Sequence, residues 1–206
     1  MKTTGICALI LMLSCASAAP AADDPATVGG ANQATPGGPK VEITDIIARV
    51  AKRTGKQFNL DPHVAGSVPI SGMDLQRVDY PRLLAILRAN YMVAYEANGV
   101  VNVLPDSISR QLPIPVTTAV SPQTLDDELV TVIWTAKSAC TAHLVPILRP
   151  LMPQAAHLAA FPQSNSLVLS DHADNARRIL DVADRLDKQA AALKQNCTDT
   201  SYKSSN

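Results

Sequence analysis

The chain has 206 residues with 18 basic and 18 acidic side chains, so its formal net charge is zero. This length suits one medium domain or two small ones, and a hydrophobic content of 47% is enough for folded cores. Aromatic residues make up only 3%, so Val, Ile, Leu and Ala must build those cores. Nucleic-acid-binding domains usually carry a strong basic excess. The balanced charge therefore argues against a nucleic-acid partner.

Residues 1–18 have the pattern of a secretory signal peptide. Lys2 gives a positive start, residues 5–13 form a short apolar run, and Ala16-Ser17-Ala18 supplies small residues at a cleavage position. The apolar run is too short to span a bilayer as a permanent anchor. The pattern predicts export of the chain.

Cys15 offers a second route of processing. It follows Leu13-Ser14, which weakly resembles the box before a lipidated cysteine, although Met12 stands where such boxes normally carry Leu. Cleavage after Ala18 is the favoured interpretation, and lipidation of Cys15 stays open. Both routes export the chain.

Two cysteines, Cys140 and Cys197, remain after cleavage at Ala18. An oxidising compartment would permit a disulfide between them. The alternative is a buried thiol at Cys140 and an unpaired Cys197 in a polar tail, because sequence alone cannot bring two Cα atoms within bridging distance. The four histidines lack the spacing of metal ligands, so we expect no metal site and no cofactor.

Composition divides the rest of the chain into two structured stretches, a linker before them, a hinge between them and a tail after them. Residues 19–40 are rich in Ala, Pro and Gly and lack an apolar period, which is typical of a flexible linker. Residues 189–206 form a polar tail. Periodic apolar patterns cover residues 41–115 and 127–188, and the Pro-containing segment 116–126 between them is interpreted as a hinge.

The first stretch predicts the order helix, strand, strand, helix, strand, strand. Apolar residues recur at intervals of three and four from Ile43, and Gly55 provides a left-handed stop for this helix. Asp79 is the predicted N-cap of the second helix. Asn98-Gly99 predicts a two-residue hairpin turn that needs positive φ. The strands expected here are residues 58–60, 68–70, 92–95 and 100–104.

The second stretch predicts the order strand, helix, strand, strand, helix. A strand over 129–134 precedes a helix over 138–152 that Pro146 should bend. A hairpin follows, and Asp171 is the predicted cap of the last helix. The two patterns together predict an α+β fold made of two small αβ sandwich domains, with helices packed on short mixed sheets.

Several runs in this order resemble the periplasmic N-terminal domains of bacterial secretins. The first stretch is similar to the first N-domain, which is shared with the short N-terminal module of TonB-dependent transducers. The second is similar to the KH-like second N-domain. The residues that carry the resemblance are 43–56, Phe58, Asp61-Pro62, Val64-Ala65-Gly66 and 83–105 in the first stretch, and 148–151, 165–171 and 177–187 in the second.

The sequence departs from the secretin pattern at two places. Residues 34–39, with two prolines and two glycines, stand where the family's first strand lies, so we expect a trimmed sheet or one that a partner completes. After residue 188 no alternating strands of a pore follow. We therefore expect secretin N-domains that are not followed by a pore.

The resemblance implies a periplasmic, non-enzymatic adaptor or assembly component of a type II secretion system, or of a related secretin or pilus system. Its implied partners are the secretin, the inner-membrane platform subunit or an exported substrate, and it would meet a membrane only through a lipid anchor. The alternative is a signalling module that contacts a membrane-bound regulator, as in TonB-dependent transducers. The second stretch argues against that alternative, because transducers lack it.

Candidate binding residues lie in the first stretch. The predicted hairpin could present an edge for strand addition, although apolar residues of this kind are more often part of the core. Arg49 and Arg53 belong to a basic run that could meet an acidic partner or lipid headgroups, or form a solvated helix face. No catalytic residue is expected, because adjacency in Ser170-Asp171-His172 is not triad geometry. The hairpin candidates are Met92, Val93, Tyr95, Val101 and Val103.

Overall fold

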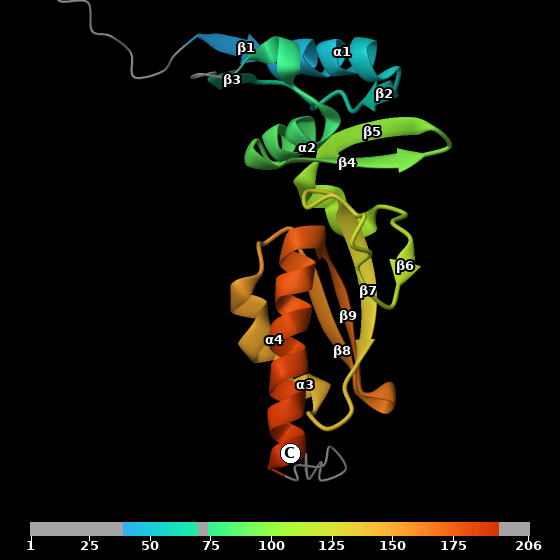
Figure 1. The fold of residues 1–206 in the computed structure, drawn as a ribbon, viewed down its shortest axis with the longest axis vertical. Helices are drawn as coiled ribbons and strands as arrows, with labels where there is room; N and C mark the ends of the chain where they lie inside the picture. The colour runs from blue at the N-terminus through green and yellow to red at the C-terminus, as the bar shows by residue number, and fades with distance from the viewer. Residues whose placement is uncertain (1–38, 70–73, 194–206) are drawn as a thin grey trace, which may run out of the picture. The chain divides into compact units, whose positions relative to one another are not determined.

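The computed structural model describes residues 39–69 and 74–193 (Figure 1). These residues lie in one compact unit and combine helices with short mixed sheets. The α+β prediction is confirmed. We call the segment 40–111 the first module and the segment 116–192 the second module.

The first module contains a two-stranded ribbon and a three-stranded sheet. In the ribbon, β1 pairs antiparallel with β3. In the sheet, β5 lies between β2, to which it is parallel, and β4, to which it is antiparallel. The elements are β1 (Lys40–Glu42), α1 (Ile43–Thr54), β2 (Gln57–Leu60), β3 (Ser67–Pro69), η1 (Leu75–Arg77), α2 (Tyr80–Ala89), β4 (Met92–Ala97), β5 (Val100–Pro105) and η2 (Asp106–Gln111).

Strand β1 corrects the prediction that no strand precedes the first helix. Its central residue, Val41, lies opposite Val68 of β3. The strand begins at Lys40, directly after Pro39, so the prolines and glycines precede it and do not interrupt its pairing. Residues 34–38, on which the prediction also rested, lie outside the described part of the chain.

Local capping signals place the helices and the hairpin of the first module. Gly55 adopts φ 70° at the end of α1, and its N–H donates to the Ala51 carbonyl at 2.9 Å. The Asp79 carboxylate accepts from the Arg82 N–H at 2.9 Å at the start of α2. Asn98 and Gly99 join β4 to β5 with φ values of 53° and 78°. These predictions are confirmed.

An aliphatic core joins α1 and α2 to both sheets of the first module. Ile46, Leu83 and Val103 are at most 1% exposed and come from α1, α2 and β5. Since Phe58 is only partly buried at the margin of this core, aliphatic side chains supply nearly all of its packing. This agrees with the low aromatic content of the sequence.

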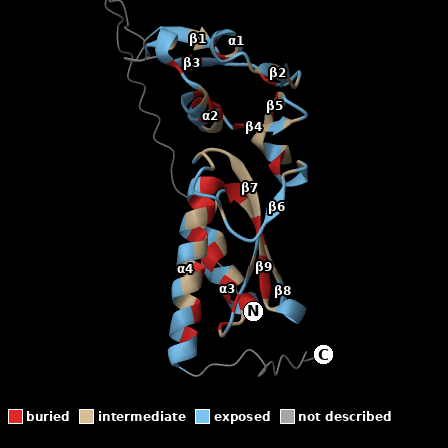
Figure 2. Cartoon of the chain, turned by 45° about the vertical axis from the view of Figure 1, so that its right-hand side comes forward, coloured by how far each residue is buried: buried red, intermediate tan, exposed pale blue. Residues whose placement is uncertain are grey.

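The second module is a four-stranded sheet with two helices packed on it. The strand order is β6-β7-β9-β8, and leucines of α3 share a core with Ile179 of α4 and with Leu167 and Leu169 of β9. Figure 2 shows buried residues on β7, β9 and α4. The elements are β6 (Val116–Thr117), β7 (Leu129–Thr135), α3 (Thr141–Leu148), η3 (Arg149–Leu151), β8 (His157–Phe161), η4 (Pro162–Ser164), β9 (Ser166–His172) and α4 (Ala173–Ala192).

Two elements of the second module differ from the sequence prediction. Val116 and Thr117, placed in a hinge, form β6 and pair in parallel with Thr131 and Val132. The helix predicted over 138–152 is α-helical only over Thr141–Leu148 and continues as a 3₁₀ turn. Pro150 lacks an N–H and cannot bond the carbonyl four residues earlier, which explains the early end of α3.

The loop before α3 is fixed by a carboxylate from α4. Asp187, only 6% exposed, accepts hydrogen bonds from the N–H groups of Lys137, Ser138 and Ala139 at 3.1, 2.7 and 2.7 Å. Burial opposes ionisation of this carboxyl, but the three backbone hydrogen bonds outweigh burial and lower the pKa of Asp187. Residues 138 and 139, for which the sequence pattern predicted a helix, are thereby held outside α3.

None of the helices within residues 39–69 and 74–193 combines the length and the apolar character that crossing a membrane requires.

Cys140, which follows the loop of residues 137–139, is disulfide-bonded. Cys15 and Cys197 lie outside the described residues. Lipidation at Cys15 and the pairing of Cys140 with Cys197 therefore stay predictions.

Candidate functional site

The hairpin residues predicted to bind a partner do not share one surface. Strand β5 lies between β2 and β4, and Val101 and Val103 are fully buried in the core. This corrects the part of the prediction that gave β5 a free edge, because a central strand has both of its backbone sides paired. Met92 and Val93 of β4 are 7% and 2% exposed. They too pack in the interior.

Strand β4 is an outer strand of its sheet, and part of it lines a pocket with residues from outside the sheet. Tyr95, half-buried, lines a pocket of about 230 Å³ together with Ile114, Pro115 and Leu129. In the same pocket, burial and the charges of two glutamates raise the pKa of Tyr80 to about 12. Residues 114–115 and 128–129 thus line the same pocket as residues 94–96 of β4.

The basic residues predicted to bind a partner lie on the exposed side of α1. Arg49 and Arg53 are both exposed and line one groove with Lys52. Arg53 donates from Nη1 to the Gln76 carbonyl at 3.0 Å and from Nη2 to the Val78 carbonyl. The structure therefore brings these two candidates together, in a groove that none of the hairpin candidates lines.

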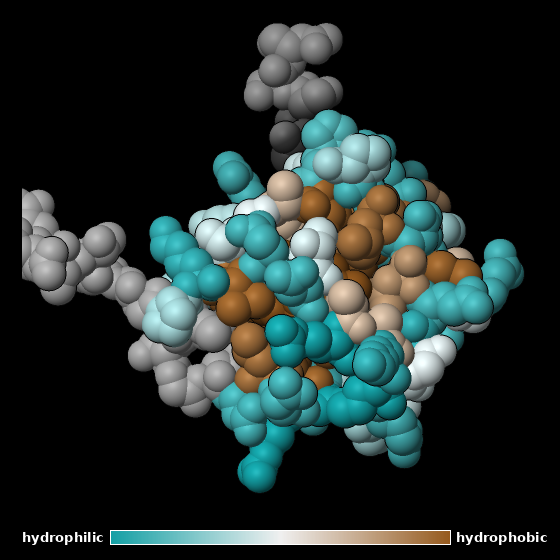
Figure 3. Space-filling model, turned by 90° about the horizontal axis from the view of Figure 1, so that it is seen from above, coloured by the Kyte–Doolittle hydropathy of each residue, from teal (hydrophilic) through white to brown (hydrophobic). Residues whose placement is uncertain are grey.

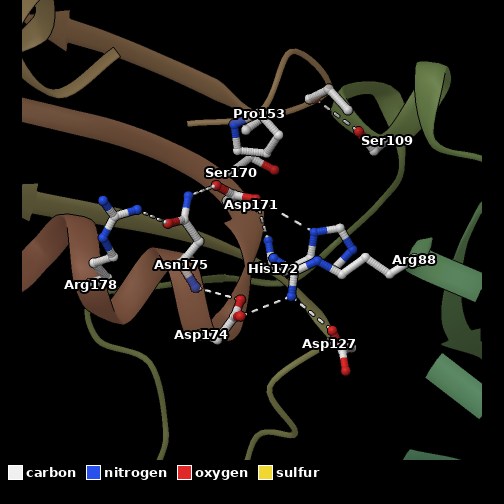
Figure 4. Close-up of polar contacts among 12 residues, drawn as sticks. Arg88, Ser109, Asp127, Pro153, Ser170, Asp171, His172, Asp174, Asn175 and Arg178 are labelled. Carbon is white, nitrogen blue, oxygen red and sulfur yellow. Dashed lines mark hydrogen bonds and ion pairs between the residues drawn. The ribbon is translucent and has the colours of Figure 1, made fainter. Parts of the chain in front are cut away.

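A second polar cluster, missed by the sequence prediction, joins the two modules (Figure 4). Arg88, in the last turn of α2, donates from Nη1 to Asp127 at 2.8 Å and to Asp174 at 2.9 Å. Burial opposes the Arg88 charge, but hydrogen bonds to the two carboxylates and their charges raise the pKa of Arg88. The acidic run that contains Asp127 was the only sequence signal for this contact.

Backbone carbonyls of the second module accept further bonds from the first. Ser109 Oγ donates to the Ala155 carbonyl at 3.0 Å, and Arg110 Nε donates to the same oxygen at 3.1 Å. Arg88, Ser109 and Tyr91 line a cavity of about 290 Å³ at this joint. Tyr91 is 77% exposed and adopts φ 58°, which is rare for a bulky residue. The cluster forms a polar joint between the modules.

Asp171 corrects the predicted cap of the last helix. The N-cap of α4 is His172, and Asp171, 2% exposed, is the penultimate residue of β9. Its carboxylate accepts from the His172 N–H and from Asn175 Nδ2, each at 2.7 Å. It therefore stabilises the strand–helix junction from the residue before the N-cap, and α4 begins one residue later than predicted.

Ser170, Asp171 and His172 do not form a nucleophile–base pair. Thr131 Oγ1 donates to Ser170 Oγ at 3.3 Å. His172 Nδ1 lies 3.5 Å from Asp171 Oδ1 and makes no hydrogen bond within the described residues. Since catalysis by a serine triad requires the histidine to bond the serine hydroxyl, this geometry does not suit a serine triad.

We predict that the Arg88–Asp127 pair contributes a measurable coupling energy to the joint. A double-mutant cycle with Arg88→Gln and Asp127→Asn should give about 1 kcal/mol in urea unfolding, since the pair is largely shielded from solvent. The Arg185–Asp181 pair, exposed on α4 with 2.9 Å between its atoms, provides the control. Its coupling should be several-fold smaller. Equal coupling in the two cycles would contradict a stabilising role for the joint.

Comparisons with known proteins relate most of the chain to secretins. It is 29% identical over 153 residues to the secretin XcpQ of Pseudomonas aeruginosa, covering 73% of this chain and 22% of XcpQ. It is 27% identical over 152 residues to the secretin ExeD of Aeromonas hydrophila, covering 71% of this chain and 22% of ExeD. The chain thus spans about a fifth of the length of these relatives. No family model matches the chain.

A solved assembly shares the fold. This is the type II secretion system outer membrane complex of Klebsiella pneumoniae, which contains PulD, PulS and the PulC HR domain. The match has a TM-score of 0.62 and 24% identity, and it covers 74% of this chain and 26% of the matched chain. The KH-like character of the second module stays a prediction. The chain is homologous to the N-terminal domains of type II secretion secretins.

Proposed function

We propose that this protein is a periplasmic, non-enzymatic component of a type II secretion system and acts by binding other proteins of that system. The homology of nearly three quarters of the chain to secretin N-terminal domains carries the proposal. The buried pairing of Asp171, His172 and Asn175 supports a structural role for the titratable groups at the joint. The proposed partners are the secretin, the inner-membrane platform subunit or an exported substrate.

The β1–β3 ribbon is the proposed docking edge. Each of its strands has one hydrogen-bonded neighbour, so each leaves one backbone side without a strand partner among the described residues. Such edges accept an added strand from another protein. Because Lys40 and Glu42 are exposed while Val41 is half-buried, the ribbon has a polar outer face and an apolar inner one. This alternation suits an edge that pairs through its backbone.

Site-specific crosslinking in the periplasm tests the docking edge. A photoreactive residue at Lys40 of the full chain should crosslink to secretion-system subunits. The same residue at Arg185, whose side chain is 73% exposed on α4, is the matched control and should give little crosslinking. The ribbon is not the docking edge if both positions give the same crosslinks, or if only Arg185 crosslinks to secretion-system subunits.

A further inference from the structure

A groove with three cationic side chains lies between α1 and η1. It has a volume of about 530 Å³, and Leu75 and Gln76 of η1 form its opposite wall with Val78. Lys52 and Arg53 follow Arg49 by three and four residues, so the three side chains share one side of the helix. Figure 3 looks onto the molecule from the side of α1 and β1, where hydrophilic side chains protrude around smaller hydrophobic patches.

The positive charge of this groove is not neutralised within the described part of the chain. None of the three groove cations, Arg49, Lys52 and Arg53, forms an ion pair with a described carboxylate. The neighbouring cations do: Lys56 bonds Glu96 at 2.7 Å, and Arg77 bonds Asp74 at 3.3 Å. The three groove cations are therefore available to an external anion.

Arg53 is held in place by neutral groups. Its guanidinium donates to the Gln76 and Val78 carbonyls, and these bonds cross 23 and 25 residues of sequence. Carbonyls fix the position of the guanidinium without cancelling its charge, and they leave further N–H donors for a ligand. A cation fixed in advance loses less side-chain entropy when it binds.

We infer that this groove binds an acidic segment of a partner protein. Arg49 and Arg53 are separated by ~6 Å along the helix axis. Carboxylates on alternate residues of an extended chain are separated by about 6.5 Å, which matches this spacing. Leu75, half-buried in the opposite wall, provides an apolar contact for the backbone between them.

A membrane surface is the less suitable ligand. Basic helices that lie on a lipid surface bury an apolar face in the headgroup region. The large exposed hydrophobic side chains among the described residues all lie outside α1 and η1, namely Tyr91, Val116, Ile133, Ile147, Phe161 and Leu193. The inference deepens the proposed function by naming the chemistry of a partner, and it rests on that function for the existence of one.

Fluorescence anisotropy of the purified full chain with a labelled peptide of alternating glutamate and serine tests the inference. Removing two charges with Arg49→Gln and Lys52→Gln should weaken binding about tenfold, equivalent to ~1.4 kcal/mol. The control variant Arg185→Gln with Lys188→Gln removes the same charge from exposed, ion-paired positions on α4 and should leave the affinity unchanged. Binding should also weaken as salt is raised.

Three results would overturn the inference: no peptide binding, equal loss in both double variants, or cosedimentation with phosphatidylglycerol vesicles that needs Arg49 and Lys52 while the peptide does not bind. Thermal unfolding of each variant checks that it is folded. Crosslinking from Lys40 to secretion subunits can succeed while the peptide fails to bind. The failure of this inference is therefore distinguishable from the failure of the proposed function.

Discussion

Replacing Asp187 with alanine is expected to lower the free energy of unfolding by about 3–5 kcal/mol. The Asp187 carboxylate accepts three backbone N–H groups, from Lys137, Ser138 and Ala139. Alanine would leave these donors without a protein acceptor, and the loop before α3 would lose its attachment to α4. Urea unfolding monitored by circular dichroism measures the change.

Asp184→Ala is the matched control for this prediction. Asp184 lies on the same helix, but its side chain is 49% exposed and, among the described residues, its ion pair is with Lys188 at 2.5 Å. Its replacement should cost about 0.5 kcal/mol or less. If the Asp187 and Asp184 variants unfold at the same urea concentration, Asp187 does not anchor the loop.

The lowered pKa of Asp187 adds a dependence on pH. A carboxyl whose pKa is lower in the folded protein than in the unfolded chain stabilises the fold above the unfolded value of about 3.9. That stabilisation is lost as the pH falls through the lower, folded value. As the pH falls from 5 to below the folded pKa of Asp187, the wild-type protein should therefore lose more stability than Asp187→Asn. Parallel acid titrations of the two proteins would contradict the assignment.

Leu83→Ala is expected to destabilise the first module by about 2–5 kcal/mol. Leu83 is fully buried in the core that joins α1, α2 and β5. Truncation removes apolar contacts and leaves a cavity that the surrounding aliphatic side chains fill only in part. Hydrogen exchange should show the largest loss of protection in α2, β4 and β5.

Arg82→Ala, at the exposed position before Leu83, is the control for this substitution. Its effect should stay within about 0.5 kcal/mol, because its side chain lies outside the core. Equal destabilisation by the two variants would show that the Leu83 contacts do not limit the stability of the fold.

The features that were predicted correctly depend on neighbouring residues. Gly55, Asp79 and the Asn98-Gly99 turn act within four positions of their own place in the chain, through backbone conformation or a cap. Such signals are legible in a sequence because they need no knowledge of tertiary packing. The secretin resemblance rested on longer runs of the same elements in the same order.

The features that were missed depend on distant contacts. Strand β6 exists only because Val116 pairs with Thr131. Asp171 was predicted as a helix cap, but pairing with Val130 keeps it in β9. The Arg88 joint reaches partners 39 and 86 residues away. No local pattern encodes these distances.

The candidate surface was predictable in composition but not in geometry. The basic run on α1 is visible in the sequence, whereas the carbonyl contacts that fix Arg53 require η1 to pack beside the helix. Burial of Val101 and Val103 follows from β5 being central, which depends on the pairing of β2 with β5. Sequence patterns identify candidate residues, and the fold decides which of them reach the surface.

We propose that this protein binds components of a type II secretion system. Affinity purification of the tagged full chain from the periplasm, followed by mass spectrometry, tests it most directly. We expect enrichment of the secretin or an inner-membrane platform subunit over a tagged, exported protein of unrelated fold. If neither subunit is recovered above that control, from cells that express the secretion system, the proposed binding is wrong.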